Sequence, residues 1–204
     1  MTLDLIDNIV RWLGGLQAYA KLGIILVGVW RGTKRQAGRR TGRMGSWLRS
    51  PWFYLASVLL FFGICYYGWS PLPWKAPLQT RAWMLALGSV LYFPGMFFVL
   101  WGRLALGKNY FVSTGFGAQL FAGHQLVTDG PFAIVRHPMY SGLIFAALGA
   151  ILIYSTWTNL FFVFFAPLTS VRARHEEAAL AAEFGAKWQE YRQRVPAFIP
   201  RLRK

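Results

Sequence analysis

Long stretches without a single charged side chain are the feature that most constrains this chain. Residues 51–74 and 138–171 are 24 and 34 residues long, and none of them is Asp, Glu, Lys or Arg. A helix that crosses a bilayer needs roughly 20 mostly apolar residues, so runs of this length are typical of membrane proteins. The composition agrees, because 55% of the 204 residues are hydrophobic and 14% are charged. The sequence therefore predicts an all-α, polytopic integral membrane protein with a single domain.

Three segments are predicted to span the membrane as single helices, at about residues 9–30, 51–74 and 82–102. The uncharged run 138–171 is too long for one straight helix, and the polar stretch 155–159 divides it, which predicts a helical hairpin. Together these segments make about five transmembrane helices. Residues 176–194 have apolar side chains at helical spacing, which predicts an amphipathic helix in the C-terminal tail.

The distribution of lysine and arginine predicts the orientation, because short loops rich in them stay in the cytoplasm. Residues 31–50 hold seven basic and no acidic side chains, residues 103–138 hold three and one, and residues 172–204 hold eight and four. With the N-terminus outside and an odd number of spans, all three segments lie in the cytoplasm. We expect a bacterial-type inner-membrane protein with its active site facing the cytoplasm, and with residues 31–49 against anionic headgroups.

The net charge of +15 does not indicate nucleic-acid binding, because the basic residues fall in blocks between apolar runs. The single cysteine, Cys65, lies inside an apolar run, so it can form neither an intramolecular disulfide nor a thiolate zinc site. No metal site is predicted, and the oligomeric state is left open.

Polar residues form three clusters in the predicted cytoplasmic segments. They lie at 124–132, at 136–142 where the hairpin begins, and at 172–177 where it ends. Taken singly, such residues could be interfacial anchors or a surface ion pair between Arg172 and Glu176. Because the two ends of a hairpin lie side by side, the second and third clusters are expected to converge. Their convergence favours a binding or catalytic site.

The residues of these clusters match a known family. The first motif is Leu126-Val127-Thr128-x-Gly130-Pro131-Phe132-x-x-Val135-Arg136-His137-Pro138-Met139-Tyr140-x-Gly142. The second is Glu176-Glu177-x-x-Leu180-x-x-x-Phe184-Gly185-x-x-Trp188-x-x-Tyr191-x-x-x-Val195-Pro196-x-x-Ile199-Pro200. In this order around a hairpin, they resemble the isoprenylcysteine carboxyl methyltransferase family and its phospholipid N-methyltransferase relatives. The chain departs from the family pattern at Ala186 and Lys187, where acids are frequent, and at Trp188 and Phe132, which replace other aromatic residues.

The resemblance covers roughly residues 101–204 and implies a membrane-embedded methyltransferase without a nucleotide-binding sheet. Residues 101–204, with the hairpin 138–171 and the tail, would form the core that binds S-adenosylmethionine. Residues 1–100 would supply membrane helices on the side of a lipophilic acceptor. The acceptor itself is left open among prenylated protein C-termini, phospholipid amines, and small hydrophobic thiols or acids.

The resemblance also implies roles for single residues. Glu176 would accept hydrogen bonds from the ribose diol or pair with the cofactor's ammonium, and His137 would meet its carboxylate. Arg172 matches the position near the acceptor and would orient an attacking carboxylate, as the catalytic residue. The implied cofactor contacts are His124, Gln125, Leu126, Val127, Phe132, His137, Pro138, Met139, Tyr140 and Glu176, with Glu177 in relatives that use both acids.

Two other classes of protein remain as alternatives. One is a membrane reductase of the sterol type that uses NADPH, although the acidic pair Glu176 and Glu177 is a poor partner for a 2′-phosphate. The other is a non-catalytic transporter or scaffold, which charged residues inside the spans would favour. The uncharged runs speak against transport.

Overall fold

The computed structural model describes residues 2–33, 37–40, 50–110, 119–121 and 123–201. Its α-helices within these ranges are α1 (Leu3–Thr33), α2 (Pro51–Tyr67), α3 (Leu78–Leu106), α4 (Pro138–Tyr154), α5 (Trp157–Phe165), α6 (Thr169–Phe184) and α7 (Ala186–Arg194). Short 3-10 turns cover Gly107–Asn109, Gly130–Ala133 and Ala166–Leu168. Strands β1 (Ala37–Arg40) and β2 (Gln119–Phe121) pair antiparallel, with Ala37 opposite Phe121. The predicted helical fold is confirmed, with this small strand pair as an addition.

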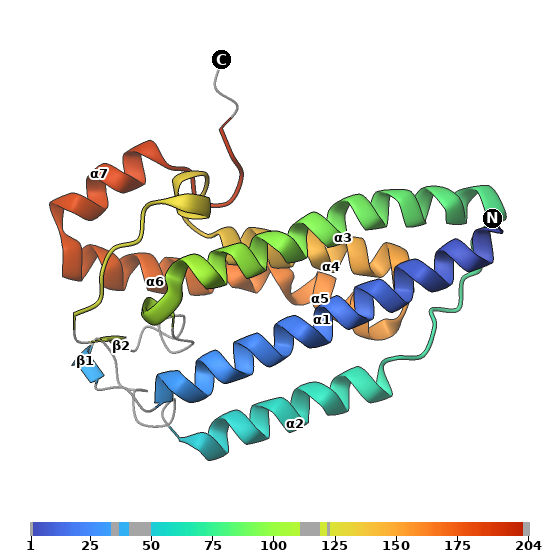
Figure 1. Cartoon of the computed structure of the whole chain (residues 1–204), viewed down its shortest axis with the longest axis horizontal. Coiled ribbons are helices and arrows are strands. Elements are labelled where there is room, and N and C mark those ends of the chain that lie inside the picture. The colour runs from blue at the N-terminus through green and yellow to red at the C-terminus, as the bar shows by residue number, and fades with distance from the viewer. Residues whose placement is uncertain (1, 34–36, 41–49, 111–118, 122, 202–204) are drawn as a thin grey trace.

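The long helices lie side by side and alternate in direction (Figure 1). The end of α1, the beginning of α2 and the end of α3 meet at one end of the bundle, where α6 and α7 also lie. The N-terminus, the beginning of α3 and the end of α4 lie toward the opposite end. The chain thus brings its helix ends together in two groups, one at each end of the bundle.

Helices α3 and α4 form the centre of the bundle and meet through glycines. A Cβ atom on Gly95 would lie 2.8 Å from the carbonyl oxygen of Gly142, and one on Gly88 would lie 3.0 Å from that of Gly149. Small residues let two helix backbones approach this closely, which favours packing in the absence of water. The contact positions the beginning of α4, which carries the second polar cluster.

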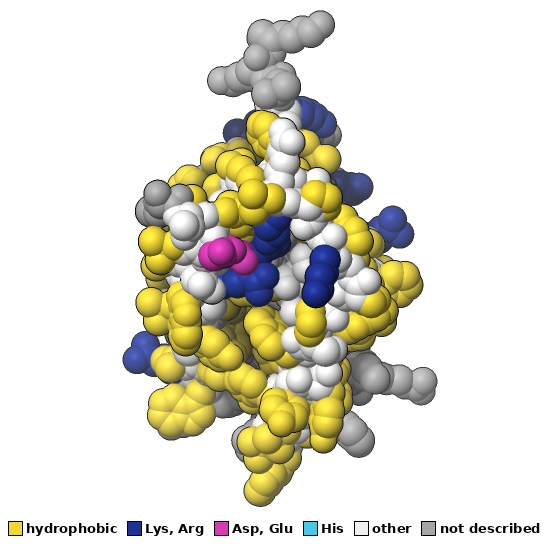
Figure 2. Space-filling view, turned by 90° about the vertical axis from the view of Figure 1, so that its right-hand side faces the viewer, with side chains coloured by type: hydrophobic (Ala, Val, Ile, Leu, Met, Phe, Trp, Pro, Cys, Tyr) yellow, Lys and Arg dark blue, Asp and Glu magenta, His cyan; other side chains and the backbone are white. Residues whose placement is uncertain are grey.

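Helix α1 is joined to this pair by polar contacts near its N-terminal end. The hydroxyl of Tyr92 donates to the carbonyl of Gly14 at 2.8 Å, and that of Tyr154 donates to the carbonyl of Arg11 at 2.8 Å. Arg81 pairs with Asp7 and also donates to the carbonyl of Leu152. Figure 2 looks at this end of the molecule, where hydrophobic side chains surround a small group of acidic and basic ones.

The outer surface of the bundle is strongly apolar. Exposed side chains include Trp12 at 80%, Leu60 at 67% and Phe164 at 76% of their full accessible area. Such a surface suits contact with lipid. Within the described residues, Leu78–Asn109 is long and apolar enough to cross a membrane, whereas the apolar helices Leu55–Tyr67 and Pro138–Tyr154 are shorter.

Three predicted boundaries are wrong. Helix α2 ends at Tyr67 rather than near residue 74, because the carbonyl of Gly68 accepts the N–H of Thr158 at 2.8 Å and the chain turns to pair with α5. The second arm of the hairpin is short, since α5 ends at Phe165 before a 3-10 turn that contains Pro167. A proline has no N–H to continue an α-helix.

The third error is the tail helix, which was predicted as continuous over residues 176–194. The chain breaks at Gly185, whose φ of +50° favours glycine, so that α6 and α7 point in different directions. The basic connector 31–49 lies outside the described residues at 34–36 and 41–49, apart from strand β1.

Candidate active site

The beginning of α4 is held by the C-terminal tail. The backbone N–H groups of Arg136 and His137 donate to the carbonyls of Pro196 and Ala197 at 2.8 and 3.0 Å. The hydroxyl of Ser141 donates to the carbonyl of Phe198 at 2.7 Å. Pro138 occupies the first turn of the helix, where a missing N–H costs nothing. Backbone and side-chain hydrogen bonds from the tail therefore hold the second polar cluster, residues 136–142, in place.

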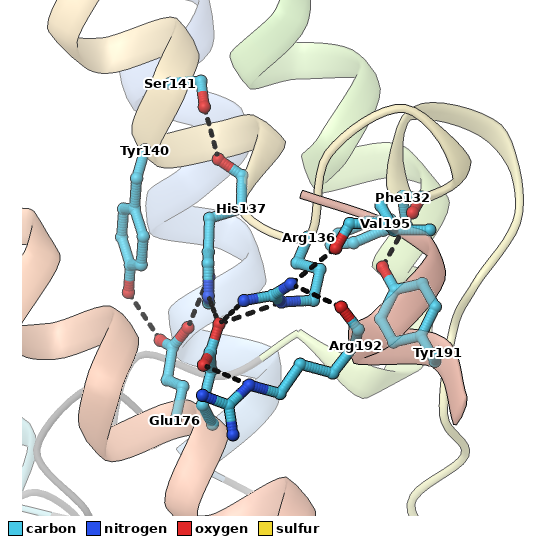
Figure 3. A network of polar contacts seen from close by, with 10 residues as sticks. Phe132, Arg136, His137, Tyr140, Ser141, Glu176, Tyr191, Arg192 and Val195 are labelled. Carbon is cyan, nitrogen blue, oxygen red and sulfur yellow. Dashed lines mark hydrogen bonds and ion pairs between the residues drawn. The ribbon is translucent and has the colours of Figure 1, made fainter. Parts of the chain in front are cut away.

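Two acids from α6 face this helix start. His137 Nε2 lies 2.9 Å from a carboxylate oxygen of Glu177, and its Nδ1 lies 3.8 Å from Glu176. Arg136 donates to the same oxygen of Glu177 from Nε at 3.0 Å and from Nη2 at 2.9 Å. The hydroxyl of Tyr140 donates to Glu176. Figure 3 shows the side chains of Tyr140 and His137 next to each other, with Glu176 below them and Arg136 on the far side of His137.

The two adjacent acids have opposite electrostatic environments. Burial raises the pKa of Glu176 above its usual range, although the hydrogen bond from Tyr140 and the charges of His137 and Arg172 oppose the effect. Burial also acts on Glu177, but hydrogen bonds from His137 and Arg136 outweigh it and lower the pKa of Glu177 to about 2. Glu177 is thus a fixed carboxylate, whereas Glu176 is the acid whose charge is costly without a partner.

A cavity of about 340 Å³ opens beside this network, between α1, α3, α4, α6 and the loop before α4. A volume of this order suits a small-molecule ligand. Glu177 is not among the lining residues, because it faces Arg136 and His137 instead. The residues predicted from the sequence that do line it are His124, Gln125, Leu126, Val127, Phe132, His137, Pro138, Met139, Tyr140, Arg172 and Glu176.

Arg172 is part of the cavity rather than a surface ion pair. Its guanidinium lies 5.9 Å from the centre of the Tyr140 ring, close enough for a cation–π contact. The hydroxyl of the same Tyr140 binds Glu176. Tyr140 therefore contacts both Arg172 and Glu176, the two residues that helical spacing placed on one face of α6.

Several cavity residues were missed by the sequence reasoning. Trp188 was noted only as a landmark of the second motif, yet it is 1% exposed and its Nε1 finds no hydrogen-bond partner among the described residues. Tyr191, three residues on, donates its hydroxyl to the carbonyl of Phe132 at 2.7 Å. Ile25, Asn109 and Tyr110 line the cavity from segments that carry no motif, so spacing alone could not have identified them.

His124 is a second cavity-lining residue with a buried, unpaired polar atom. Burial lowers the pKa of this imidazole, against the weaker field of Glu183, and its Nδ1 has no partner within the described part of the chain. Buried polar atoms are almost always hydrogen-bonded in native proteins, so unpaired nitrogens on two cavity-lining residues, His124 and Trp188, favour a polar ligand there.

The fold and the site define a class of protein. It is a helical bundle with an apolar outer surface and a partly polar cavity of about 340 Å³ at one end. The chain belongs to the phospholipid methyltransferase family, which matches residues 83–187. The family expected from the motifs is therefore confirmed, and the matched region contains most of α3, all of α4, α5 and α6, and the cavity walls that they form.

Three curated relatives extend the comparison. The chain is 42% identical over 79 residues to a protein-S-isoprenylcysteine O-methyltransferase of Schizosaccharomyces pombe, which covers 38% of this chain and 34% of the relative. It is 30% identical over 161 residues to methanethiol S-methyltransferase 2 of Bradyrhizobium diazoefficiens, which covers 76% and 60%. It is 32% identical over 162 residues to a cobalt-zinc-cadmium resistance protein of Cupriavidus metallidurans, which covers 78% and 64%. The chain thus spans between about a third and two thirds of the length of these relatives.

Proposed function

We propose that this chain is an integral membrane methyltransferase that transfers a methyl group from S-adenosylmethionine to a lipophilic acceptor at the cytoplasmic face. The observation that carries the proposal is the cavity of about 340 Å³, which is lined by residues of both family motifs. Family membership supports methyl transfer, and two relatives are named for O- and S-methylation. The same comparisons give no support to the reductase or the transporter.

The residues of the cavity fit this cofactor. Glu176 is a partly exposed carboxylate that accepts from Tyr140, so it can accept more from a ribose diol or pair with an ammonium group. The buried Nε1 of Trp188 and the Nδ1 of His124 are unpaired polar atoms of residues that line the same cavity. Leu126, Val127 and other apolar side chains can cover the adenine.

The cofactor supplies a methyl group that is already activated, because a sulfonium is a good leaving group. The protein has to orient the acceptor and exclude water. Tyr140 and His137 are held by the acids of α6, which fixes the wall against which the cofactor lies. Arg172, beside Tyr140, orients an anionic acceptor. No nucleophilic side chain is required.

The helix arrangement supports the proposed topology of about five spans. Helix directions alternate, and the basic segments that follow α1, follow α3 and begin at α6 all start at the same end of the bundle (Figure 1). In this topology, residues 1–100 form the acceptor side and residues 101–204 form the cofactor-binding core. The cavity then opens near the cytoplasmic headgroups, where a lipophilic acceptor can enter from the bilayer.

Equilibrium binding tests the proposal. The detergent-purified chain is titrated with S-adenosylmethionine and, in parallel, with NADPH, and the Glu176→Ala and His137→Ala variants are treated in the same way. We expect saturable binding of S-adenosylmethionine that each variant weakens by about tenfold or more, since each loses a hydrogen bond to a charged group.

Glu190→Ala is the matched control, because Glu190 is an exposed acid on α7 whose ion pair with Arg194 lies away from the cavity. This variant should bind like the unaltered chain. Binding of NADPH in place of S-adenosylmethionine, or equal binding by all three variants, would overturn the assignment.

A further inference from the structure

Each carbonyl of the tail segment 195–198 accepts a hydrogen bond from the start of α4 or from the two residues before it. The first two carbonyls accept from the guanidinium and from the backbone N–H of Arg136. The third accepts from the N–H of His137 at 3.0 Å, and the carbonyl of Phe198 accepts from the hydroxyl of Ser141 at 2.7 Å. These four bonds fix the register of the tail, because a shift by one residue would separate each donor from its acceptor.

This register places the ring of Phe198 on the imidazole of His137. The two ring centres lie 5.3 Å apart and the ring planes differ by 28°, which is a stacked arrangement. The ring of Tyr140 also stacks on this imidazole, with the centres 5.7 Å apart and the planes at 21°. His137 lines the cavity and is 6% exposed. Two aromatic rings therefore fix the plane of an imidazole that belongs to the cavity wall.

The hydrogen bond of His137 to α6 determines which ring nitrogen is left for a ligand. Its Nε2 lies 2.9 Å from a carboxylate oxygen of Glu177. Although burial opposes it, the hydrogen bonds from His137 and Arg136 lower the pKa of Glu177 to about 2, so this ionised carboxylate can only accept. Nε2 therefore donates to Glu177. The Nδ1 atom lies 3.8 Å from Glu176, beyond hydrogen-bond distance, and is left for a ligand.

The direction of Nδ1 depends on the plane of the ring more than on the bond at Nε2. Rotation of an imidazole about its bond to Cβ displaces Nδ1 more than Nε2, so the bond to Glu177 alone holds Nδ1 loosely. Stacking against Phe198 restricts this rotation. Phe198 is not among the residues that line the cavity, so its ring can act on a ligand only through His137.

We propose that Phe198 is a positioning residue, whose ring holds the imidazole of His137 in the orientation in which Nδ1 meets the amino-acid end of S-adenosylmethionine. This inference rests on the proposed methyltransferase function. The carbonyls of the tail determine where the ring of Phe198 lies, and the ring determines how His137 is oriented. Because the imidazole is ordered before the cofactor arrives, binding loses less side-chain entropy.

Equilibrium binding of S-adenosylmethionine to the full chain in detergent tests the proposal. We expect Phe198→Ala to weaken binding about five- to tenfold and Phe198→Tyr to keep it within about twofold, because only tyrosine keeps the planar ring. Phe198→Leu, which keeps most of the apolar volume and so protects the fold, should weaken binding like alanine. In a His137→Ala background, Phe198→Ala should weaken binding no further, since the ring then has no imidazole to hold.

Ile199→Ala is the control for a general disturbance of the tail, because Ile199 follows Phe198 directly and is 74% exposed. This variant should bind S-adenosylmethionine like the unaltered chain. Equal losses in Phe198→Ala and Ile199→Ala, a loss that adds to that of His137→Ala, or full binding by Phe198→Leu would overturn the positioning role.

A measurement without cofactor separates this inference from the function on which it rests. Diethyl pyrocarbonate acylates accessible imidazoles, and peptide mass spectrometry compares the buried His137 with the exposed His175 in the same sample. Relative to His175, His137 should react severalfold faster in Phe198→Ala than in the unaltered chain or in Phe198→Tyr. An unchanged rate would overturn the stacking contact. A raised rate together with no S-adenosylmethionine binding by the unaltered chain would overturn the proposed function instead.

Discussion

Glu177 is the residue on which the local structure of the site depends. Its carboxylate joins the second and third polar clusters, because Glu177 belongs to α6 while its partners Arg136 and His137 directly precede α4. A second arginine, Arg192 of α7, lies 4.0 Å away. One side chain therefore ties three segments together without lining the cavity.

We expect Glu177→Gln to destabilise the chain by about 2–3 kcal/mol at neutral pH, because it removes the charge that Arg136 and His137 surround. The folded pKa of about 2 lies below the ordinary value of 4.5, so this contribution is full above pH 4.5 and is lost as the pH falls through about 2. Thermal unfolding at several pH values measures it. Glu190→Gln, at an exposed acid, should change little, and an equal loss in both variants would contradict the prediction.

Glu176 should make cofactor binding depend on pH. Burial raises its pKa, and a ligand that pairs with the ionised carboxylate lowers it again, so that binding releases a proton. Affinity for S-adenosylmethionine should therefore rise with pH up to the raised pKa and stay level above it. Calorimetry in two buffers of different ionisation enthalpy counts the proton. Glu176→Gln should bind without this proton release, and persistence of the release in the variant would exclude Glu176 as its source.

Arg172 should act on turnover more than on cofactor binding. It lines the cavity beside Tyr140, and a fixed cation there aligns an anionic acceptor. Arg172→Ala should lower kcat by about a hundredfold or more and change the Kd for S-adenosylmethionine by less than about threefold. Radiolabelled methyl transfer and equilibrium binding give the two values. A large loss of cofactor affinity would instead place Arg172 in the cofactor site.

The sequence predicted which residues form the site better than it predicted which side chains contact each other there. The two ends of a hairpin must meet, so His137 and Glu176 were expected together, and both line one cavity. The sequence paired Arg172 with Glu176 by helical spacing, but the structure gives Glu176 the hydroxyl of Tyr140. Ile25 could not be linked to the cavity at all, because its position depends on how α1 packs against α3.

At the scale of elements, the glycine contact between α3 and α4 determines where the site lies. Gly95→Ala should destabilise the chain by about 1–3 kcal/mol, because the new Cβ would lie 2.8 Å from backbone atoms of Gly142 and Ala146. Gly63→Ala on α2 is the control, since nothing lies within 4 Å of its Cβ position and alanine favours the helix. Thermal unfolding in detergent compares the two, and equal midpoints would argue against a close contact.

Element boundaries were predicted well where a polar stretch interrupts an apolar run and poorly elsewhere. The turn between α4 and α5 falls at Ser155 and Thr156, inside the polar segment 155–159 that predicted it. The end of α2 depends on contacts with Thr158, which lies 91 residues after Tyr67 in the sequence. The break at Gly185 has a local cause, but helical periodicity continues across it and hides it.

At the scale of the whole molecule, the proposed orientation can be tested by labelling. In a Cys65→Ala background, Lys75→Cys places a thiol between α2 and α3, and Lys187→Cys places one on α7 at the opposite end of the bundle. A membrane-impermeant thiol reagent should label the first position in intact cells and the second only after permeabilisation. The reverse pattern would invert the topology, and labelling of both positions in intact cells would rule out a bundle that spans the membrane.

The hydrogen bonds from residues 196–198 to the beginning of α4 have a consequence for the order of biosynthesis. In the proposed topology, the membrane helices α1 to α5 precede this segment in the chain, so they can enter the bilayer while the ribosome is still adding the tail. The wall that carries His137 is fixed only after the carbonyls of Pro196 and Ala197 have emerged. A nascent chain that stalls before this point would be inserted in the membrane but would lack a formed cofactor pocket.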